Sequence, residues 1–442
     1  MRHVMMSLRT EVIEDVAGLV RLVPAWRALL ARSSAPSPSK TPTWLLAWWR
    51  QFGGLDGRKL CVIAAHDNAT GELVGLVPMC RRTVMVRRVV PIRRLELLAT
   101  GEDHADEICS DYTGAIVARR CEAEVARAMA RLLVSGRLDG FDHLVMERMA
   151  GEDPFTAALA AALDAHGVPA TVAEEASCPY IPLPGSFDAY KKQLDSDARY
   201  VVNRALRELD KWAGKAGYTR VVARTPAELA EGRAILHSLH GERWSGSGRS
   251  DYEGVFASER FTRFHDEVMA ALLDSPDGKL ELQWLVVDGR PVVALYNIVY
   301  GGRVYFYQSG RKLDVPKGVK LGLAAHALAL GAAIEDGHTE YDFLAGESQY
   351  KRQLALAKHP LVTLTAAAPS MRARTAVAAA SALNQGLRRA RRELAGQRDR
   401  LAAVDPAQRS RAASFALTAL NRILPPSPSP SSSSGTGAGQ GT

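Results

Sequence analysis

At 442 residues the chain is too long for one ordinary hydrophobic core, since cores stop growing at roughly 250 to 300 residues, so the length predicts two globular units. Apolar residues at 47% and charged residues at 24% are ordinary values for a soluble protein, and each unit can bury a core. The formal net charge of +8 lies in residues 371–442, which hold eleven arginines against three carboxylates. The remaining body is neutral, which argues against a nucleic-acid-binding surface there.

The cysteines are scattered, odd in number and without a Cys-x-x-Cys pair, which favours buried thiols in a reducing compartment. The five are Cys61, Cys80, Cys109, Cys121 and Cys178. The N-terminal stretch acquires Glu11, Glu14 and Asp15 before an apolar run can form, so no secretory signal is expected. No stretch reaches the roughly 18 uninterrupted apolar residues of a membrane helix. We therefore expect a cytoplasmic protein, and no pattern of metal ligands predicts a metal site.

The first half of the chain mixes helices and strands. Residues 1–50 are predicted to be helical, with Trp44 and Trp48 on one buried face. Two apolar runs surround Asp-Asn-Ala-Thr-Gly in residues 60–82, which is typical of a β-hairpin. The further elements predicted are strands at 93–100 and 141–149 and helices at 122–136 and 154–166.

A segment rich in proline, at residues 178–194, is predicted to be the boundary between the two units. A basic amphipathic helix is expected after it at 197–214. The sequence Thr-Pro-Ala-Glu at 225–228 is a capping box with proline at the first helical position. It predicts a helix that runs to about Trp244.

The clearest β pattern of the chain lies at residues 280–310. Apolar residues alternate with others around Asp288-Gly289 and Gly301-Gly302, which predicts a three-stranded antiparallel meander. A helix at 318–335 and a strand at 341–344 follow. The hairpin predicted at residues 60–82 and the strand after it have a pattern similar to that of this meander. The simplest interpretation is a duplicated α/β fold.

Three local patterns could carry chemistry. The first is the loop and helix start at 315–322, where Lys317, Gly318 and Lys320 would suit a phosphate at a helix N-terminus. An ordinary helix start preceded by proline is the competing interpretation. The second is His240, Arg243 and Trp244, which continue the apolar stripe of the capped helix at spacings of three and four. They indicate either a helix C-terminus charge interaction or the wall of a polar cleft.

The third pattern is Tyr-Asp-Phe-Leu-Ala-Gly-Glu-Ser-Gln-Tyr-Lys at 341–351, where an apolar strand ends in a dense polar cluster. Asp342 lies among apolar neighbours, and carboxylates are rarely buried unless they are paired or used. Tyr350 and Lys351 follow Gly346 at the start of a new helix or turn. The competing interpretation is a hydrogen-bonded structural Asp beside a solvated helix end.

The combination of these features resembles the GNAT-type acyltransferase fold, and within it the CelD-like branch of bacterial acyltransferases related to FemAB-type transferases. The likeness covers roughly residues 20–370 and is most specific in the second half. It rests there on H-x-x-R-W at His240, on D-G-R-P-V-V-A in the meander, on the P-K-G-V-x-L helix start and on the 341–351 stretch. In the first half it rests on the tryptophan-rich helix and on Ser-Asp-Tyr-Thr-Gly at 110–114.

The resemblance implies an α/β protein of two tandem GNAT-like domains, each with a mixed, mainly antiparallel sheet flanked by helices. The domains are expected at residues 1–183 and 184–370. Residues 371–424 are then predicted to be a basic helical extension and 425–442 a disordered Pro/Ser/Gly tail. The basic extension is expected to be solvated. The alternative is that it binds an anionic membrane or a partner protein.

The resemblance also implies that the strands at 303–309 and 340–345 splay apart, so that an acyl thioester lies between them. The polar cluster after Leu344 would then lie at the mouth of the gap. The loop at 317–322 departs from the family's usual Q/R-x-x-G-x-G/A pattern for binding phosphate. The resemblance therefore supports the fold more strongly than it supports coenzyme A binding.

A set of residue roles follows from the same resemblance. The catalytic candidates are His240 as general base, Tyr350 as general acid for the departing thiolate, and Asp342 as an orienting group or a base through water. The candidates for substrate binding are Arg243, Trp244, Phe343 and Lys351. Those for binding the cofactor acetyl-CoA, or another acyl-CoA, are Gln308 through its backbone, Lys317, Gly318, Val319, Lys320 and Gly322.

The expected activity is therefore transfer of an acyl group, acetyl in the first instance, from acyl-CoA to an amine or hydroxyl. The family association favours a sugar or polysaccharide precursor, as in cellulose biosynthesis, as the acceptor. Two alternatives stay open. One is a FemAB-like aminoacyl transferase that uses charged tRNA, and the other is a non-catalytic scaffold in exopolysaccharide or cellulose assembly.

Overall fold

The computed structural model of the chain describes residues 7–86, 89–138, 140–245, 254–346 and 348–403, except for the side chains of 243–245 and of part of the last helix. The chain divides into two compact units, Met1–Arg374 and Thr375–Thr442. In the described residues the second unit consists of the continuation of helix α12 (Met371–Ala403). The sheets and cavities belong to the first unit, whose residues 1–183 and 184–370 we call the first and second halves.

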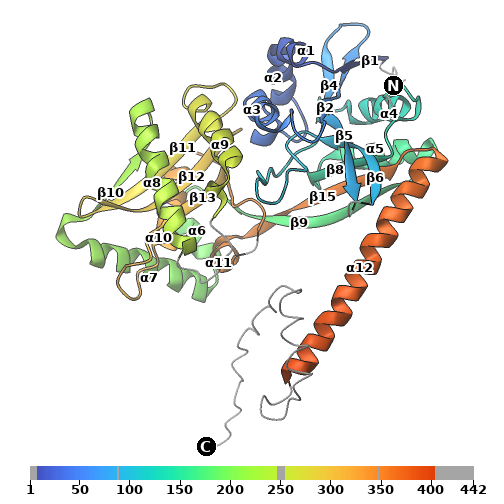
Figure 1. Ribbon diagram of the computed structural model, residues 1–442. Coiled ribbons are helices and arrows are strands. Elements are labelled where there is room, and N and C mark those ends of the chain that lie inside the picture. Colours follow the sequence, from blue (N-terminus) through green and yellow to red (C-terminus); the bar gives the residue numbers. More distant parts are fainter. Residues whose placement is uncertain (1–6, 87–88, 139, 246–253, 347, 404–442) are drawn as a thin grey trace, which may run out of the picture. The chain divides into compact units, whose positions relative to one another are not determined.

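Within the described residues, eleven strands form one sheet and four form another. The large sheet has the order β10, β11, β12, β13, β14, β9, β15, β8, β6, β5, β2 (Figure 1). In that order its strands span Tyr218–Val222, Lys279–Val287, Arg290–Tyr300, Arg303–Arg311, Glu340–Asp342, Ala170–Pro182, Ala357–Ala367, His143–Ala150, Val90–Leu97, Met79–Val86 and Lys59–Leu60. The small sheet is β1 (Leu8–Ile13), β3 (Val62–Asp67), β4 (Leu73–Val77) and β7 (Ile116–Val117).

The helices of the first unit flank these sheets. They are α1 (Val16–Arg21), α2 (Val23–Ala31), α3 (Pro42–Phe52), α4 (Glu122–Val134), α5 (Pro154–Ala165), α6 (Phe187–Gln193), α7 (Ser196–Ala213), α8 (Pro226–Ser245), α9 (Glu259–Ala271), α10 (Leu321–Glu335) and α11 (Gln349–Leu354). None of the helices in the described residues is long and apolar enough to cross a bilayer.

The large sheet repeats one motif in its two halves. β6 runs parallel to β8, and the connection between them contains α4. β13 runs parallel to β14, and that connection contains α10. The other recorded strand pairs of the sheet are antiparallel. These two parallel pairs confirm the prediction of a duplicated α/β fold with mixed, mainly antiparallel sheets.

The strands of the second half bury side chains on both of their faces. Val293 and Leu295 pack with α7 and α10 in one core, while Ala294 and Tyr296 pack with α8 and α9 in the other. Successive side chains of a strand point to opposite faces, so a strand that is covered on both sides is apolar throughout. This explains the nearly unbroken apolar run of β12.

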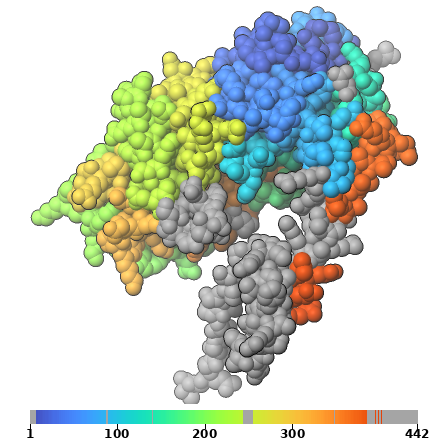
Figure 2. Space-filling view, in the orientation of Figure 1, coloured from blue at the N-terminus to red at the C-terminus, as the bar shows by residue number. Residues whose placement is uncertain are grey.

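Contacts between aromatic side chains join the two halves. Trp44 in α3 meets Phe264 in α9 edge to face, with ring centroids 4.9 Å apart, and Tyr307 in β13 at 5.8 Å. Figure 2 shows the segment around α9, in yellow, against the blue first half. Trp44 and Trp48 are both buried, which confirms the predicted core packing.

Several local predictions are confirmed where the signal lies in consecutive residues. Asp288 and Gly289 both have positive φ angles, 48° and 71°, as a two-residue hairpin turn of the favoured twist requires. The capping box closes, because the Glu228 amide donates to Thr225 Oγ1 at 3.2 Å and the Thr225 amide donates to Glu228 Oε2 at 2.9 Å. The meander and the helices predicted at 197–214 and 318–335 are present as β11 to β13, α7 and α10.

Other elements differ from the predictions. Residues 8–13, predicted to be helical, form β1, and residues 178–182, predicted within a boundary segment, are the end of β9. The predicted hairpin at 60–82 contains β3 and β4, but its last residues begin β5 in the large sheet. Cys109 is exposed, although all five thiols were expected to be buried. The division into domains at residue 183 remains a prediction.

Candidate functional site

The strands β13 and β14 separate after a short parallel contact. They pair over three residues each, from Arg303 opposite Glu340 to Tyr305 opposite Asp342. β13 continues to Arg311, whereas the chain leaves β14 after Asp342. Residues on both sides of this opening line two cavities.

β13 also bulges at the level of the opening. Tyr296 of β12 pairs with Gln308 and the next residue, Asn297, pairs with Phe306, so Tyr307 is one extra residue in β13. A bulge disrupts the ladder locally and changes the direction of nearby backbone groups. The backbone around Gln308 is therefore irregular at the level where a thioester carbonyl was predicted.

The first cavity, which we call the helix-side cavity, has a volume of about 350 Å³. It is lined by Ser309, Arg311, Val319, Lys320, Leu321, Gly322, Leu323, His326, Gln349, Tyr350 and Gln353. Three of the predicted cofactor residues, Val319, Lys320 and Gly322, are among them. Neither Lys317 nor Gly318 belongs to the described residues that line it.

The helix-side cavity meets the start of α10. Lys320 is the N-terminal cap residue of this helix, and its side chain makes no capping hydrogen bond with the first turn among the described residues. Unpaired amides and the helix dipole favour an anion at this position. The Lys320 and Arg311 side chains line the same cavity and add positive charge.

The second cavity, which we call the loop-side cavity, has a volume of about 260 Å³. It is lined by Cys109, Asp111, Val255, Phe261, Phe306, Tyr307, Gln308, Ser309, Phe343, Leu344, Ala345, Gly346, Ser348, Tyr350 and Lys351. The polar cluster of the 341–351 stretch therefore does lie at a cavity. Ser309 and Tyr350 line both cavities, so these two residues mark where the cavities approach each other.

Tyr350 is held between aromatic neighbours near the start of α11. Its ring stacks on that of His326, with centroids 5.0 Å apart and 14° between the planes. His326 Nδ1 lies 3.2 Å from the hydroxyl of Tyr341. Tyr350 therefore packs on α10 through His326, and His326 is in turn held by Tyr341 of β14. Both elements lie on one side of the opening.

Lys351 is buried and stabilises the turn that follows β14. Its ammonium group donates to the carbonyl oxygens of Leu344 at 3.2 Å and Ala345 at 2.8 Å. Leu344 and Gly346 both have positive φ angles, 56° and 104°, which makes this turn an uncommon backbone shape. Burial lowers the pKa of Lys351, and the nearby Asp111 carboxylate opposes that shift.

Asp342 is buried and contacts both halves of the protein. Its Oδ2 accepts from the Tyr112 hydroxyl at 2.5 Å, and its Oδ1 accepts from the Leu344 amide at 2.6 Å. Burial raises the pKa of Asp342 to about 7, although these hydrogen bonds favour the charged form. The side chain thus helps to set the course of the chain where the two strands separate.

Asp111 was not predicted as a site residue, yet its buried carboxylate lines the loop-side cavity. Oδ1 accepts from Arg148 Nη1 at 3.0 Å, and Oδ2 accepts from the Ala345 amide at 2.7 Å. Burial raises the pKa of Asp111, and Arg148 opposes the shift. The signal available in the sequence was its place in Ser-Asp-Tyr-Thr-Gly, the motif that the resemblance singled out in the first half.

His240 lies in α8, behind β13. Its Nδ1 is 3.0 Å from the carbonyl oxygen of Ser309, and the described residues that line the two cavities do not include it. Its predicted partner Asp342 has its recorded hydrogen bonds with Tyr112 and Leu344 instead. The side chains of Arg243 and Trp244 lie outside the described residues.

Comparisons with known proteins agree with the fold of the second half. Residues 196–352 match the family model described as an acetyltransferase (GNAT) domain. No curated protein matches the chain. Among solved structures, L-PGS from Bacillus licheniformis is similar at 13% identity and a TM-score of 0.44, over 83% of this chain and 96% of that one.

Two further solved structures share the likeness. A tandem GNAT protein from the clavulanic acid biosynthesis pathway has 14% identity and a TM-score of 0.42, over 82% of this chain and all of that one. FemX has 12% identity and a TM-score of 0.42, over 80% of this chain and 96% of that one. Likeness at this level does not bear on substrate. The match of residues 196–352 to the GNAT acetyltransferase domain model indicates that the enzyme class of the chain is acyltransferase.

Proposed function

We propose that the chain transfers an acyl group from acyl-CoA to an amine or hydroxyl acceptor across the opening between β13 and β14. The donor lies in the helix-side cavity and the acceptor in the loop-side cavity. The observation that carries this proposal is that Ser309 and Tyr350 line both cavities. A thioester that reaches this point from one side meets an acceptor that arrives from the other.

The helix-side cavity suits the diphosphate of coenzyme A. The first turn of α10 offers backbone amides, and Gly322 there has no side chain to obstruct a phosphate. Lys320 and Arg311 supply the compensating charge. The departure from the usual phosphate-binding sequence is thus offset by two cations at the cavity.

The chemistry is a direct displacement at the thioester carbonyl. The acceptor nitrogen or oxygen attacks the carbonyl carbon, the new C–N or C–O bond forms, and the C–S bond breaks. Backbone groups at the bulge near Gln308 support the developing oxyanion, because fixed N–H donors stabilise such charge. Tyr350 gives its proton to the departing thiolate, and its place between the cavities supports this role.

Two groups compete for removal of the acceptor proton. Asp111 is favoured by position, because its carboxylate lines the cavity in which the acceptor would lie. His240 remains the predicted base, and because it faces the Ser309 carbonyl oxygen it would have to reach the acceptor proton through a bridging water. Asp342 was predicted to orient His240. Its hydrogen bond with the Leu344 amide orients the turn after β14 instead.

The acceptor that we propose is a sugar or polysaccharide precursor, in line with the CelD-like resemblance. The loop-side cavity of about 260 Å³ has room for one monosaccharide-sized group. Phe343 and Lys351, the predicted substrate-binding residues that line it, provide an apolar wall and a fixed turn.

Titration calorimetry with coenzyme A tests the donor site in the full chain. Lys320→Ala should weaken binding about tenfold, which corresponds to about 1.4 kcal/mol for one charged contact. Lys317→Ala is the matched control, since Lys317 belongs to the same loop but does not line the cavity, and its Kd should stay within about twofold. Absence of binding to the unaltered chain would contradict the proposal.

The same preparation separates the donor classes. Radiolabelled acetyl-CoA and aminoacyl-tRNA are each offered with a panel of amino sugars, and transfer of label is measured. Transfer from acetyl-CoA supports the proposal. Transfer from aminoacyl-tRNA alone would favour the FemAB-like alternative, and no transfer together with no binding would favour a scaffold.

A further inference from the structure

A third cavity, of about 190 Å³, lies beside β14 and β15 in the first unit, and its lining includes Tyr112, Glu152, Arg303, Tyr305 and His359. The predicted mechanism uses none of the ionisable groups around it except Asp342. We propose that Glu340, Asp342 and His359 form a binding site for a divalent transition-metal cation, of which Zn²⁺ is the test case, with one coordination position directed toward this cavity.

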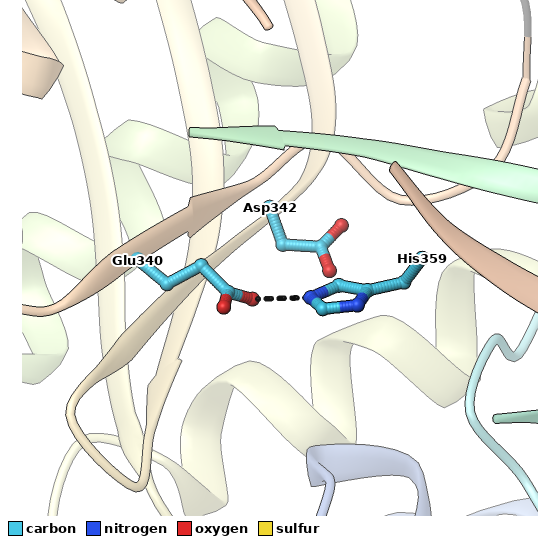
Figure 3. A group of neighbouring side chains, drawn as sticks. All are labelled: Glu340, Asp342 and His359. Atoms are coloured by element: carbon cyan, nitrogen blue, oxygen red, sulfur yellow. Dashed lines mark ion pairs between the residues drawn. The ribbon is translucent and has the colours of Figure 1, made fainter. Parts of the chain in front are cut away.

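The sheet brings the three donors together. Glu340 and Asp342 are alternate residues of β14, so their side chains point to the same face. His359 comes from β15, which is separated from β14 by β9. One ligand atom from each residue lies within 4.8 Å of the other two, and Figure 3 shows both carboxylates beside the imidazole.

The spacing of one pair of donors, Glu340 and His359, suits two ligands of one metal. Glu340 Oε1 is 3.4 Å from His359 Nε2, beyond the usual hydrogen-bond range of about 2.7 to 3.2 Å. Two ligands in a tetrahedral zinc site, each about 2.0 to 2.1 Å from the metal, are about 3.3 to 3.4 Å apart. For this pair of donors the observed separation is compatible with a shared cation as well as with an ion pair.

The same two atoms lack hydrogen bonds. Glu340 Oε1 and His359 Nε2 are buried and form an ion pair with each other, but neither has a well-aligned hydrogen bond among the described residues. Glu340 as a whole is only 7% exposed. Since buried polar atoms almost always have well-aligned hydrogen bonds, an oxygen and a nitrogen that are held by long ion pairs leave a place for a cation as a further partner.

The surroundings hold the donors in place. The other imidazole nitrogen of His359, Nδ1, lies 3.5 Å from the Glu152 carboxylate, which resembles the carboxylate–histidine–metal arrangement that orients ligand imidazoles. The ring of Tyr180 stacks on that of His359, with centroids 3.9 Å apart and 3° between the planes. Asp342 is fixed by its hydrogen bonds with Tyr112 and Leu344.

The chemistry of the donor set narrows the class of ion. One imidazole with two carboxylates suits zinc and its first-row neighbours, whereas an imidazole is a poor ligand for calcium or magnesium. Three protein ligands leave a position for water or a bound ligand, and His359 and Tyr112 both line the adjacent cavity. The competing interpretation is an ion pair between protonated His359 and Glu340, with Arg303 Nη1 3.8 Å from the same carboxylate oxygen.

The test uses the untagged full chain, stripped of metal with a chelator and then titrated with Zn²⁺ by calorimetry, with bound metal counted by mass spectrometry. We expect about one equivalent per chain. Co²⁺ should give the visible absorption bands of a low-coordinate site. Glu340→Gln and His359→Gln, which keep the side-chain volume or nearly so, should each weaken Zn²⁺ binding by at least about tenfold.

His104→Gln is the matched control, because the side chain of His104 is 95% exposed and is not part of the grouping. Its Zn²⁺ affinity should equal that of the unaltered chain, and circular dichroism should show that all three variants are folded. Failure of the stripped chain to bind Zn²⁺ would overturn the proposal in favour of the ion pair. So would equal loss of binding in the control, or binding in both ligand variants as tight as in the unaltered chain.

Discussion

Individual residues of the 341–351 stretch explain why an apolar strand ends in a polar cluster. Lys351 returns to the turn before it and binds two of its carbonyl oxygens, while Asp111 binds an amide of the same turn from the other half. Two positive φ angles in three residues leave backbone groups pointing out of any regular ladder. The cluster is therefore the set of partners that a sharp turn beside a cavity requires.

Tyr350 is the residue on which the proposed reaction depends most directly. Tyr350→Phe removes the hydroxyl but keeps the ring that stacks on His326. We expect kcat for thiol release from acetyl-CoA to fall roughly 10²-fold, with KM for the donor within about threefold, because general acid catalysis acts in the transition state. Stopped assays with a thiol reagent measure both constants.

Tyr200→Phe is the control for that substitution, since Tyr200 is 55% exposed on α7. Its kcat should match that of the unaltered enzyme. If Tyr350→Phe also kept kcat within about twofold, the general acid would have to be another group or the solvent.

At the scale of elements, the sequence predicts those helices and strands whose signals lie within one short segment. The meander, α7, α8 and α10 were predicted because turn residues, caps and periodicity lie within one segment. β9 was missed because residues 171–175 are exposed and do not alternate, and because Pro179 lies inside it. Its pairing with β15 joins residues that lie far apart in the sequence, which no local pattern encodes.

The candidate site divides in the same way. Phe343, Tyr350 and Lys351 were found together because they belong to one contiguous motif, and all three line the loop-side cavity. Asp111 was missed because its contact with Ala345 spans 234 positions of the chain. The sequence shows the motif that contains Asp111. Whether Asp111 belongs to the site depends on how the two halves pack against each other.

The packing of β13 against α8 gives a prediction about stability. A Cβ atom at Gly310 would lie 2.4 Å from the His240 amide nitrogen and 2.7 Å from the Leu239 carbonyl carbon. These are backbone atoms that cannot turn aside, so Gly310→Ala should lower the free energy of unfolding by about 1 to 3 kcal/mol. Urea unfolding followed by circular dichroism measures the change.

Gly331→Ala provides the contrast for that measurement. Gly331 lies inside α10, and apart from the neighbouring backbone of this helix a Cβ atom there would meet none of the described heavy atoms within 4 Å. Alanine forms helices better than glycine by up to about 1 kcal/mol, so this variant should be as stable as the unaltered chain or more stable. Equal stability of both variants would mean that β13 is not held closely against α8.

At the scale of the whole molecule, the two halves share their central strands. β9 precedes residue 184 but pairs with β14 of the second half, and β15 comes from the second half but pairs with β8 of the first (Figure 1). The two strands also pair with each other. Each half thus completes the other's sheet, which accounts for Met1–Arg374 being one compact unit.

Asp277 allows a test of this shared stability as a function of pH. Its buried carboxylate accepts from Arg27 Nε at 2.7 Å and from the Thr43 amide and hydroxyl at 3.0 and 2.7 Å, so it fixes α2 and α3 to the turn before β11. Burial would raise the pKa of Asp277, but the hydrogen bonds from Arg27 and Thr43 outweigh it and hold the pKa below its usual value. A folded-state pKa below the unfolded one contributes stability above about pH 4, and this contribution is lost as the pH falls through the folded value.

Asp277→Asn should therefore cost about 1 to 3 kcal/mol at pH 7, and the difference from the unaltered chain should shrink below about pH 4. Because the halves share strands, the loss should appear as a shift of one unfolding transition of the first unit in calorimetry. Asp274→Asn, an exposed change in the same turn, should stay within about 0.5 kcal/mol. A loss that is as large at pH 3 as at pH 7 would contradict the ionic origin, and two separate transitions would mean that each half is stable without the strand it receives from the other.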